Sequence, residues 1–285
     1  MMRRGRLVLL TMLATLAAAL MLAAIAAVVM VRMGWYDVGA VKQHFQPTFK
    51  LLELGLRYSV RHHAREILAP PLTGGMAQRG ARLYAEHCVQ CHGAPGVAPE
   101  LATLALQPSP GPLVHMTRRW QPNELYWLVT NGVKMTAMPA WEFRLSEQER
   151  WQLVAFIGEL PKLSPQQGAA MLAAVRNTEA VPAPPEQPLD DRPDARRGRV
   201  ALTQYACRSC HMIPGLPGPS VDVGPPLRDL ARQRYIAGYL PTSEENMVRW
   251  LRHPDLVKPG TAMPALHVTE ADARDMAHWL LSAQP

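Results

Sequence analysis

The feature that most constrains this chain is a five-residue motif, Cys-x-x-Cys-His, which occurs once in each half of the sequence. The two copies use all four cysteines of the 285 residues, so no cysteine remains for a disulfide framework. The residues that define the two copies are Cys88, Cys91 and His92 in the first, and Cys207, Cys210 and His211 in the second.

This motif is the attachment signature of c-type haem. Two thiols at this spacing can form thioethers with the two vinyl groups of one porphyrin, and the next residue then offers an imidazole nitrogen to the iron. A thioredoxin-like redox site needs no such histidine, and a zinc site needs four suitably grouped ligands. Two complete copies therefore favour two covalently attached haem c groups.

The motifs belong to an internal repeat with units at about 76–160 and 194–285. In each unit Arg-Gly precedes the motif, Met-Pro-Ala follows it, and a capped helix closes the unit. Residues 146–149 form a Ser-x-x-Glu capping box, and residues 269–272 form a weaker Thr-x-x-Asp version. Strand patterns are nearly absent, so we expect all-α units. Each unit is small for burying a core, and we expect haem to form part of that core.

An uncharged apolar run from Leu7 to Val31 follows three arginines at the N-terminus. As a helix, its 25 residues would extend about 37 Å, enough to cross a hydrocarbon core of about 30 Å. The apolar region of a cleaved signal peptide is shorter, although Ala24-Ile25-Ala26 offers a cleavage site. We predict a transmembrane anchor over residues 1–34.

Residues 35–75 are predicted to form a neck. They begin with Trp35-Tyr36, a pair typical of the membrane interface. Apolar residues at 49, 52, 56 and 60 then follow the helical period, and a basic face lies opposite them. Such a helix either contacts the membrane or a partner's transmembrane helices, or it serves as a spacer with a solvated basic face.

Six prolines between positions 165 and 193 predict an extended, semi-rigid linker over residues 162–193, with a short helical piece around Ala169–Val175. The expected domains on either side of this linker are residues 76–161 and residues 194–285.

The positive charge is concentrated near the N-terminus. Residues 1–68 hold nine Lys and Arg against three Asp and Glu, whereas residues 69–285 hold 21 against 20. This distribution indicates attraction to the anionic head groups of a lipid bilayer. It argues against a nucleic-acid partner, because the two repeated units carry almost no net charge.

Both units resemble class I cytochrome c domains. The resemblance implies an all-α fold of two tandem class I domains, preceded by one transmembrane helix and an amphipathic neck helix, with His92 and His211 as iron ligands. The stretch Gly224-Pro225-Pro226-Leu227 resembles the family's Gly-Pro-x-Leu, which implies that the Pro225 carbonyl accepts a hydrogen bond from His211. The first unit has only Gly111-Pro112-Leu113, so the acceptor for His92 stays open.

A methionine opposite the histidine saturates the iron and raises its potential, as an electron carrier requires. In the second unit the candidate is Met263, before Pro264, with His253 and His267 as alternatives. In the first unit Met138 has the same Met-Pro-Ala context, and a following proline disfavours helix at the methionine. Met135 is then expected to pack against the porphyrin edge.

These inferences predict electron transfer through two His/Met-ligated haems in a bacterial periplasmic respiratory chain. The chain would be a tethered carrier, or the cytochrome c subunit of an oxidase or dehydrogenase complex, and not itself an enzyme. Its partners would be a terminal oxidase, a quinol-oxidising complex or a dehydrogenase, with no small-molecule substrate.

Covalent haem attachment takes place on the outer side of the bacterial inner membrane, so we expect periplasmic haem domains and a cytoplasmic N-terminus. The alternative function is a di-haem peroxidase-type enzyme, which needs one iron with a displaceable ligand.

Overall fold

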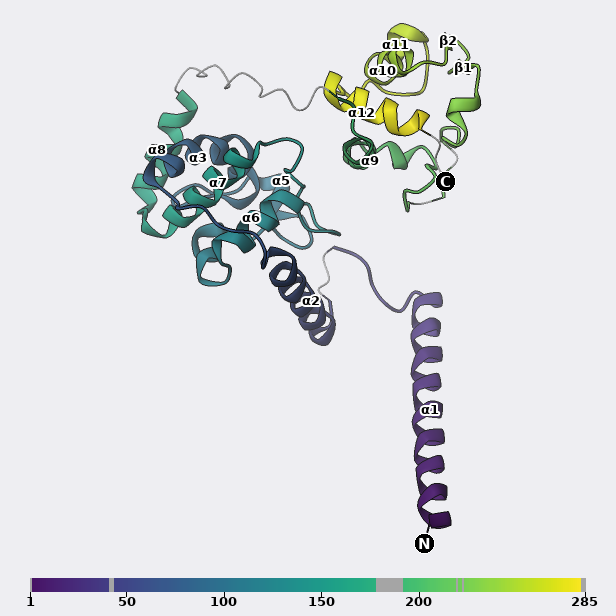
Figure 1. Cartoon of the computed structure of the whole chain (residues 1–285). Helices are drawn as coiled ribbons and strands as arrows, with labels where there is room; N and C mark the ends of the chain where they lie inside the picture. Colours follow the sequence, from purple (N-terminus) through teal and green to yellow (C-terminus); the bar gives the residue numbers. More distant parts are fainter. Residues whose placement is uncertain (1, 41–43, 178–191, 219, 222, 283–285) are drawn as a thin grey trace. The chain divides into compact units, whose positions relative to one another are not determined.

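The computed structural model describes residues 2–40, 44–177, 192–218, 220–221 and 223–282 (Figure 1). The described residues are mainly helical, with one hairpin of two short strands, which confirms the expected all-α class. The chain divides into two compact units, Met1–Glu179 and Ala180–Pro285.

The N-terminal helix α1 (Met2–Arg32) is the long purple helix in Figure 1. Its part from Arg4 to Arg32 is long and apolar enough to cross a membrane, and a signal sequence has the same properties. Its large apolar side chains are exposed, as expected of a helix whose surroundings are lipid and not protein.

The first unit is organised around the crossing of α3 (Gly74–His87) and α7 (Glu147–Glu159). Gly80 allows the close approach, because a Cβ there would lie 2.0 Å from the carbonyl oxygen of Gln152. Ser146 and Glu149 cap α7 reciprocally, as the sequence predicted. The crossing is therefore fixed by a glycine and a local cap.

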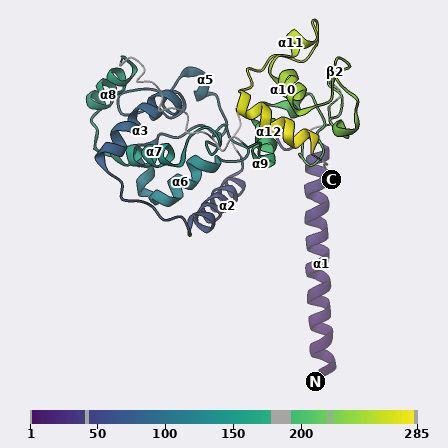
Figure 2. The same ribbon diagram turned by 45° about the horizontal axis from the view of Figure 1, so that its top comes forward.

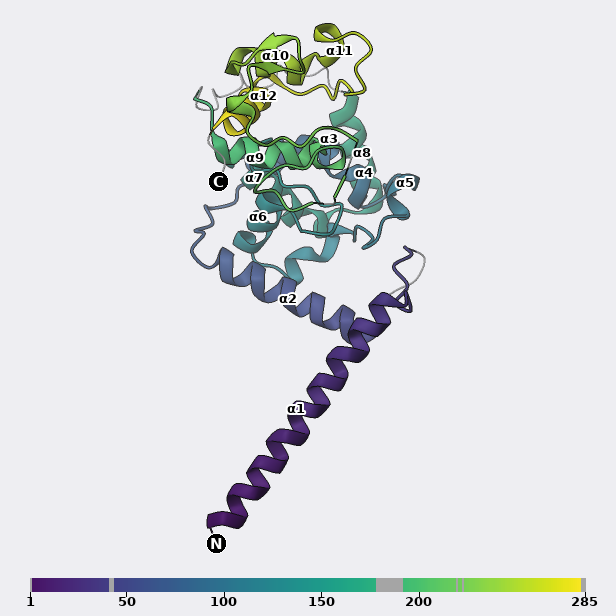
Figure 3. The same cartoon turned by 90° about the vertical axis from the view of Figure 1, so that its right-hand side faces the viewer.

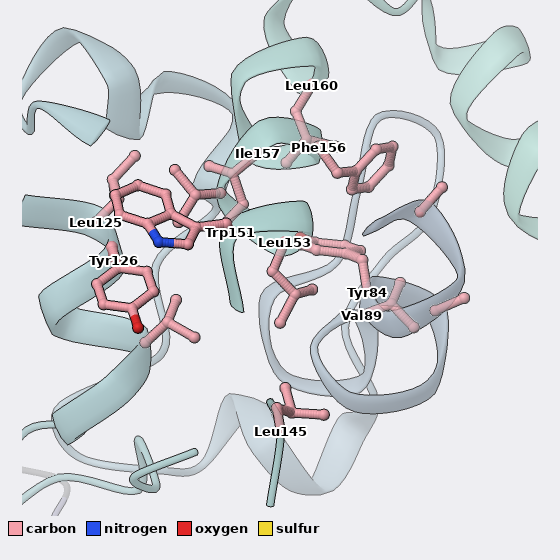
Figure 4. Close-up of a cluster of buried hydrophobic side chains, with 14 of the residues drawn as sticks. Tyr84, Val89, Leu125, Tyr126, Leu145, Trp151, Leu153, Phe156, Ile157 and Leu160 are labelled. Atoms are coloured by element: carbon pink, nitrogen blue, oxygen red, sulfur yellow. The ribbon is translucent and has the colours of Figure 1, made fainter. Parts of the chain in front are cut away.

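Aromatic rings fill much of the interior of the first unit (Figure 4). Tyr84 of α3 meets Phe156 of α7 edge to face, with ring centroids 5.2 Å apart. Tyr126 of α6 (Pro122–Asn131) stacks on Trp151 at 4.1 Å. Such pairs stabilise a core beyond the area they bury.

Helix α2 (Gln46–Ala64) lies against α6 (Figure 3). Val60 and Ala64 are fully buried in this contact. The Asn123 side chain also donates a 2.8 Å hydrogen bond to the Ala64 carbonyl. The C-terminal half of the predicted neck helix is thus part of the first unit's packing, a contact that neither sequence interpretation of the neck included.

Helix α8 (Pro165–Asn177) lies within the predicted linker, yet it packs on α3. Leu172 of this helix is buried in the same hydrophobic cluster as the residues of the α3–α7 crossing. The short helical piece expected around Ala169–Val175 is thus present as a longer helix, and its packing on α3 is what the linker interpretation did not include. Residues 178–191 of that linker lie outside the described residues.

The second unit repeats the crossing with α9 (Ala195–Gln204) and α12 (Glu270–Leu281) (Figure 2). A Cβ at Gly198 would lie 2.0 Å from the carbonyl oxygen of Asp275, so this glycine has the role of Gly80. Thr269 caps α12 by accepting a hydrogen bond from the Asp272 amide.

The remaining elements are short or cover the two crossings. In the first unit they are α4 (Val89–His92), α5 (Leu101–Leu104), η1 (Leu113–Arg118) and η2 (Leu160–Lys162). In the second they are η3 (Cys207–Ser209), η4 (Leu230–Arg232), α10 (Glu244–Arg252), α11 (Pro254–Val257) and an antiparallel hairpin of β1 (Tyr235–Ile236) and β2 (Leu240–Pro241). Tyr235 pairs with Pro241 and Ile236 pairs with Leu240.

Candidate haem-attachment sites

In the first unit, the Cys-x-x-Cys-His motif forms one tight helical turn directly after α3. The amides of Cys91 and His92 both donate to the Cys88 carbonyl, at 3.1 and 2.9 Å. Side chains three and four residues apart share one face of a helical turn. The turn therefore brings two thiols and one imidazole to the same side, as a porphyrin bound through two vinyl groups requires.

The second unit builds the same turn at the end of α9. The amides of Cys210 and His211 donate to the Cys207 carbonyl, at 3.2 and 3.0 Å. The two sites thus share one backbone design, although one is an α-helical turn and the other a 3-10 turn.

The thiols of both turns are free and partly buried. Burial, with a smaller contribution from Cys91, raises the pKa of Cys88 to about 12. Burial likewise raises the pKa of Cys207 to about 11. A thioredoxin-like site requires a lowered thiol pKa, whereas these two pKa values are raised. The apolar surroundings of the thiols therefore suit attachment to a porphyrin better than a redox-active dithiol.

His211 is held in a fixed orientation. Its Nδ1 lies 2.7 Å from the Pro225 carbonyl oxygen, so the imidazole N–H donates to this acceptor. The ring rests on the backbone at Gly224, where a Cβ would approach its Cε1 to 2.5 Å. The other ring nitrogen, Nε2, takes no part in this hydrogen bond, which is the arrangement that the Gly-Pro-x-Leu resemblance implies for an iron ligand.

His92 has a matching acceptor that the sequence analysis left open. Its Nδ1 lies 2.7 Å from the Gly111 carbonyl oxygen. Aligning Pro112-Leu113 with Pro226-Leu227 places Gly111 opposite Pro225. The Pro-Leu pair that both units share could have identified Gly111 as the acceptor. The match was hard to see because Pro110 stands where the second unit has Gly224.

The two methionine loops have the same backbone anchor. The Met138 amide donates to the Thr136 hydroxyl at 3.0 Å, and the Met263 amide donates to the Thr261 hydroxyl at 3.3 Å. Both methionines are partly buried. The shared stretch is Thr-Ala-Met-Pro-Ala, longer than the Met-Pro-Ala used to predict it, and its threonine is a positioning residue that the sequence analysis missed.

Met135, which we expect to pack against the porphyrin edge, lies at a turn of the first methionine loop. It is 96% exposed in the described chain and adopts a left-handed backbone conformation with φ of 59°. The equivalent position in the second unit is Gly260, with φ of 78°. Both loops therefore turn through a left-handed residue at this point, and the contact of Met135 with the porphyrin edge remains a prediction.

The alternative ligands in the second unit, His253 and His267, are both exposed. Met247, another methionine of that unit, is buried in its hydrophobic cluster. The pairing of His92 with Met138 and of His211 with Met263 on iron remains a prediction.

Comparison with known proteins adds independent support. Residues 75–157 match the family model of cytochrome c oxidase, cbb3-type, subunit III, and residues 195–284 match the cytochrome c family model. The fold and the paired attachment turns thus define a haem protein of the c type. The chain contains two cytochrome c domains, each of which binds one haem c covalently.

Two curated relatives are subunit 2 of cytochrome c oxidase. The protein from Alkalihalophilus pseudofirmus is 32% identical over 89 residues, which cover 31% of this chain and 25% of the relative. The protein from Bacillus sp. strain PS3 is 33% identical over 101 residues, which cover 34% of this chain and 28% of the relative. The chain thus spans about a quarter of the length of these relatives, and no solved structure matches it. These domains support electron transfer by haem.

Proposed function

We propose that this protein transfers electrons through two His/Met-ligated haems in a bacterial periplasmic respiratory chain. The observation that carries the proposal is the duplicated site: each domain joins an attachment turn, an oriented histidine and a threonine-anchored methionine loop. Haem c supplies a reversible one-electron couple when bound, and a methionine ligand closes the iron to substrates. This set of residues suits a carrier and offers no reaction site for a peroxidase.

The protein residues have distinct parts in this function. Cys88, Cys91, Cys207 and Cys210 hold the two porphyrins. His92 and His211 bind iron through Nε2, since Gly111 and Pro225 engage the opposite nitrogens. The cofactor performs the redox chemistry, while the protein fixes orientation and burial.

We further propose that α1 anchors the chain in the bacterial inner membrane, with the N-terminus in the cytoplasm and both haem domains in the periplasm. The match of residues 75–157 to an oxidase subunit III, together with the two oxidase relatives, favours a terminal oxidase complex as the partner. The protein would act there as a fixed cytochrome c subunit or as a tethered donor. Purification of the intact chain in mild detergent and identification of co-purifying subunits test this assignment.

The ligand assignment is tested with Met138→Ala and Met263→Ala. The oxidised protein should show a thioether-to-iron charge-transfer band in the red, and each single variant should lose the contribution of one haem while the double variant loses the band entirely. The affected haem should also fall in potential, because a thioether favours ferrous iron. Met135→Ala is the matched control and should retain the whole band.

If Met135→Ala removed half of the band and Met138→Ala did not, the alignment of the two loops would be wrong. Rapid turnover of hydrogen peroxide by the unmodified protein, together with a high-spin haem, would favour the peroxidase alternative instead.

A further inference from the structure

Helix α2 has two halves with different surroundings. Its C-terminal half packs on α6 through Val60 and Ala64, which are fully buried. Its N-terminal half projects beyond that contact and exposes large apolar side chains on more than one face. These exposed residues are Phe45, directly before the helix, and Phe49, Leu51, Leu52 and Leu54 within this half; Tyr58, one turn further on, is exposed as well.

Three of the exposed side chains lie along one side of the helix. Leu51, Leu54 and Tyr58 follow the i, i+3, i+7 spacing on the side of the helix away from Val60. Tyr58 and Leu51 are 66% and 71% exposed, although other helices of this unit bury residues of the same type. Soluble proteins seldom leave such a patch uncovered, so it marks an interaction surface. We call Leu51, Leu54 and Tyr58 the apolar stripe of α2.

The chain itself places this surface near the end of α1. The ring of Tyr36 contacts the ring of Phe45 edge to face, with centroids 5.7 Å apart, and its hydroxyl bonds to His44. Tyr36 is four residues beyond Arg32, the last residue of α1, a reach of about 14 Å at most. The start of α2 is therefore close to the point where α1 would leave the bilayer.

The charges beside the stripe suit the same surroundings. Lys50, Arg57 and Arg61 occupy a flank of α2, while Glu53 is its one acidic residue. Arg57 pairs with Glu53, and Arg61 pairs with Glu124 of α6 at 3.5 Å. A helix with apolar and aromatic side chains beside a basic flank lies in the head-group region of an anionic bilayer.

We propose that the N-terminal half of α2 lies in the interfacial zone of the membrane that holds α1, with the apolar stripe among the lipid chains. Because the other half of the same helix is packed on α6, this contact holds the first cytochrome domain on the membrane surface in one orientation. The contacts that transmit this constraint are the burial of Val60, the Asn123–Ala64 hydrogen bond and the ion pair between Arg119 and Glu53.

This surface adds a second, independent attachment to the single-helix anchor. An anchor of one helix followed by a flexible neck would leave the domain free to rotate. A helix shared between the bilayer and the domain would instead keep the first haem at a fixed height and facing a fixed direction. The occupant of the surface is lipid, and a second copy of the chain or a partner protein is the competing outcome.

The test uses the full-length, haem-loaded protein in nanodiscs of phosphatidylcholine and phosphatidylglycerol, doped with a diazirine-bearing phosphatidylcholine. After photolysis, mass spectrometry locates lipid adducts along the chain. We expect adducts in α1 and in residues 45–58, and several-fold fewer around Leu68, which is also exposed but lies beyond α2. Adducts in α1 alone would overturn the proposal, and their absence from both helices would overturn the membrane anchor as well.

Substitution separates lipid contact from mere proximity. The triple variant Leu51→Gln, Leu54→Gln and Tyr58→Gln should lower the yield of adducts at Phe49 several-fold while the haem spectra stay unchanged. A matched control replaces two exposed leucines and one exposed tyrosine elsewhere, with Leu68→Gln, Leu256→Gln and Tyr235→Gln, and should have no effect.

A cysteine at position 54 distinguishes the competing occupants, because the four native cysteines are consumed as thioethers. In nanodiscs, Leu54→Cys should react slowly with a charged, membrane-impermeant maleimide and should form lipid adducts. Slow reaction without lipid adducts would show that protein covers the stripe and would overturn the proposal, as would reaction as fast as that of Leu68→Cys.

Discussion

At its helix crossing the first cytochrome domain buries a pair of aromatic rings, whereas the second has a largely buried ion pair. In the first, Tyr84 packs on Phe156 at the crossing of α3 and α7. In the second, Leu202 takes the place of Tyr84, and Asp275 binds Arg197 through two hydrogen bonds of 2.6 and 2.9 Å. The residue equivalent to Asp275 in the first domain is the neutral Gln152.

What the two crossings share is the glycine. Gly80 and Gly198 would each place a Cβ 2.0 Å from a carbonyl oxygen of the facing helix. The comparison shows that this close approach defines the fold, while the side chains around it can be aromatic or charged. Cores tolerate changes of content more readily than changes of backbone separation.

The first domain also receives support from outside the repeat. Helices α2 and α8 pack on it and bury Val60, Ala64 and Leu172, whereas the described part of the second unit contains no equivalent helices. The second domain has a smaller buried cluster, with no aromatic residue among its fully buried members in the described chain. Its folding should therefore depend more on the haem.

The largest expected effect removes both cofactors. In a chain with all four cysteines changed to serine, residues 194–285 should lose their fold, while residues 76–161 keep a partly protected core, because less apolar surface is buried without haem in the second domain. Limited proteolysis followed by mass spectrometry measures the order of cleavage. Protection of the second domain after the first has been digested would contradict the comparison.

Breaking the ion pair should affect the second domain alone. Asp275→Asn removes the carboxylate that faces the partly exposed Arg197 cation, and we expect a loss of about 1.5–3 kcal/mol in the free energy of unfolding of that domain. Hydrogen exchange of α9, followed by mass spectrometry, reports the change. Glu270→Gln, which removes exposed ion pairs, is the control and should cost at most about 1 kcal/mol. Equal effects of the two variants would show that the buried pair is not a stabilising feature.

Adding a methyl group at the crossing of either domain should destabilise that domain, and the two losses should be similar. Gly80→Ala and Gly198→Ala force the helices apart and should each cost about 1–3 kcal/mol or more. Gly158→Ala on α7 has open space around its Cβ and should be neutral or slightly stabilising. Thermal unfolding, followed separately at each haem, measures the loss of stability in each variant. If Gly198→Ala were tolerated, the two crossings would not be equivalent.

The smallest effects concern the left-handed residue of the methionine loops. Gly260→Ala meets no neighbouring atom, so its cost should be the backbone strain alone, about 1–2 kcal/mol. Met135→Gly relieves the same strain in the first domain and should stabilise it by less than about 1 kcal/mol, since glycine loses more entropy on folding.

Met135→Ala should leave stability almost unchanged, because the side chain is exposed. Denaturant titrations of the three loop variants measure these differences, and a large loss from Met135→Ala would indicate that haem or a partner covers this side chain.

The sequence by itself determined the features that depend on neighbouring residues. The attachment turns close within five residues, the caps of α7 and α12 act across three, and the repeat located both methionine loops. Such features follow from local backbone chemistry, so the residue pattern alone predicted the helical class and the two haem groups. The hydrogen bond from His211 to Pro225 could also be predicted, because the second unit contains the complete Gly-Pro-x-Leu pattern.

Only the tertiary structure decided the contacts between distant segments. Asn123 meets Ala64 across 59 positions, and no periodicity in α2 shows that Val60 faces α6 and not lipid or solvent. The same holds for the packing of α8 on α3, since the sequence predicted a short helix there but no partner for it, and for Gly111, whose carbonyl reaches His92 across 19 positions. An amphipathic pattern predicts that a helix buries its apolar face. Which segment covers that face depends on the packing of the whole folded chain.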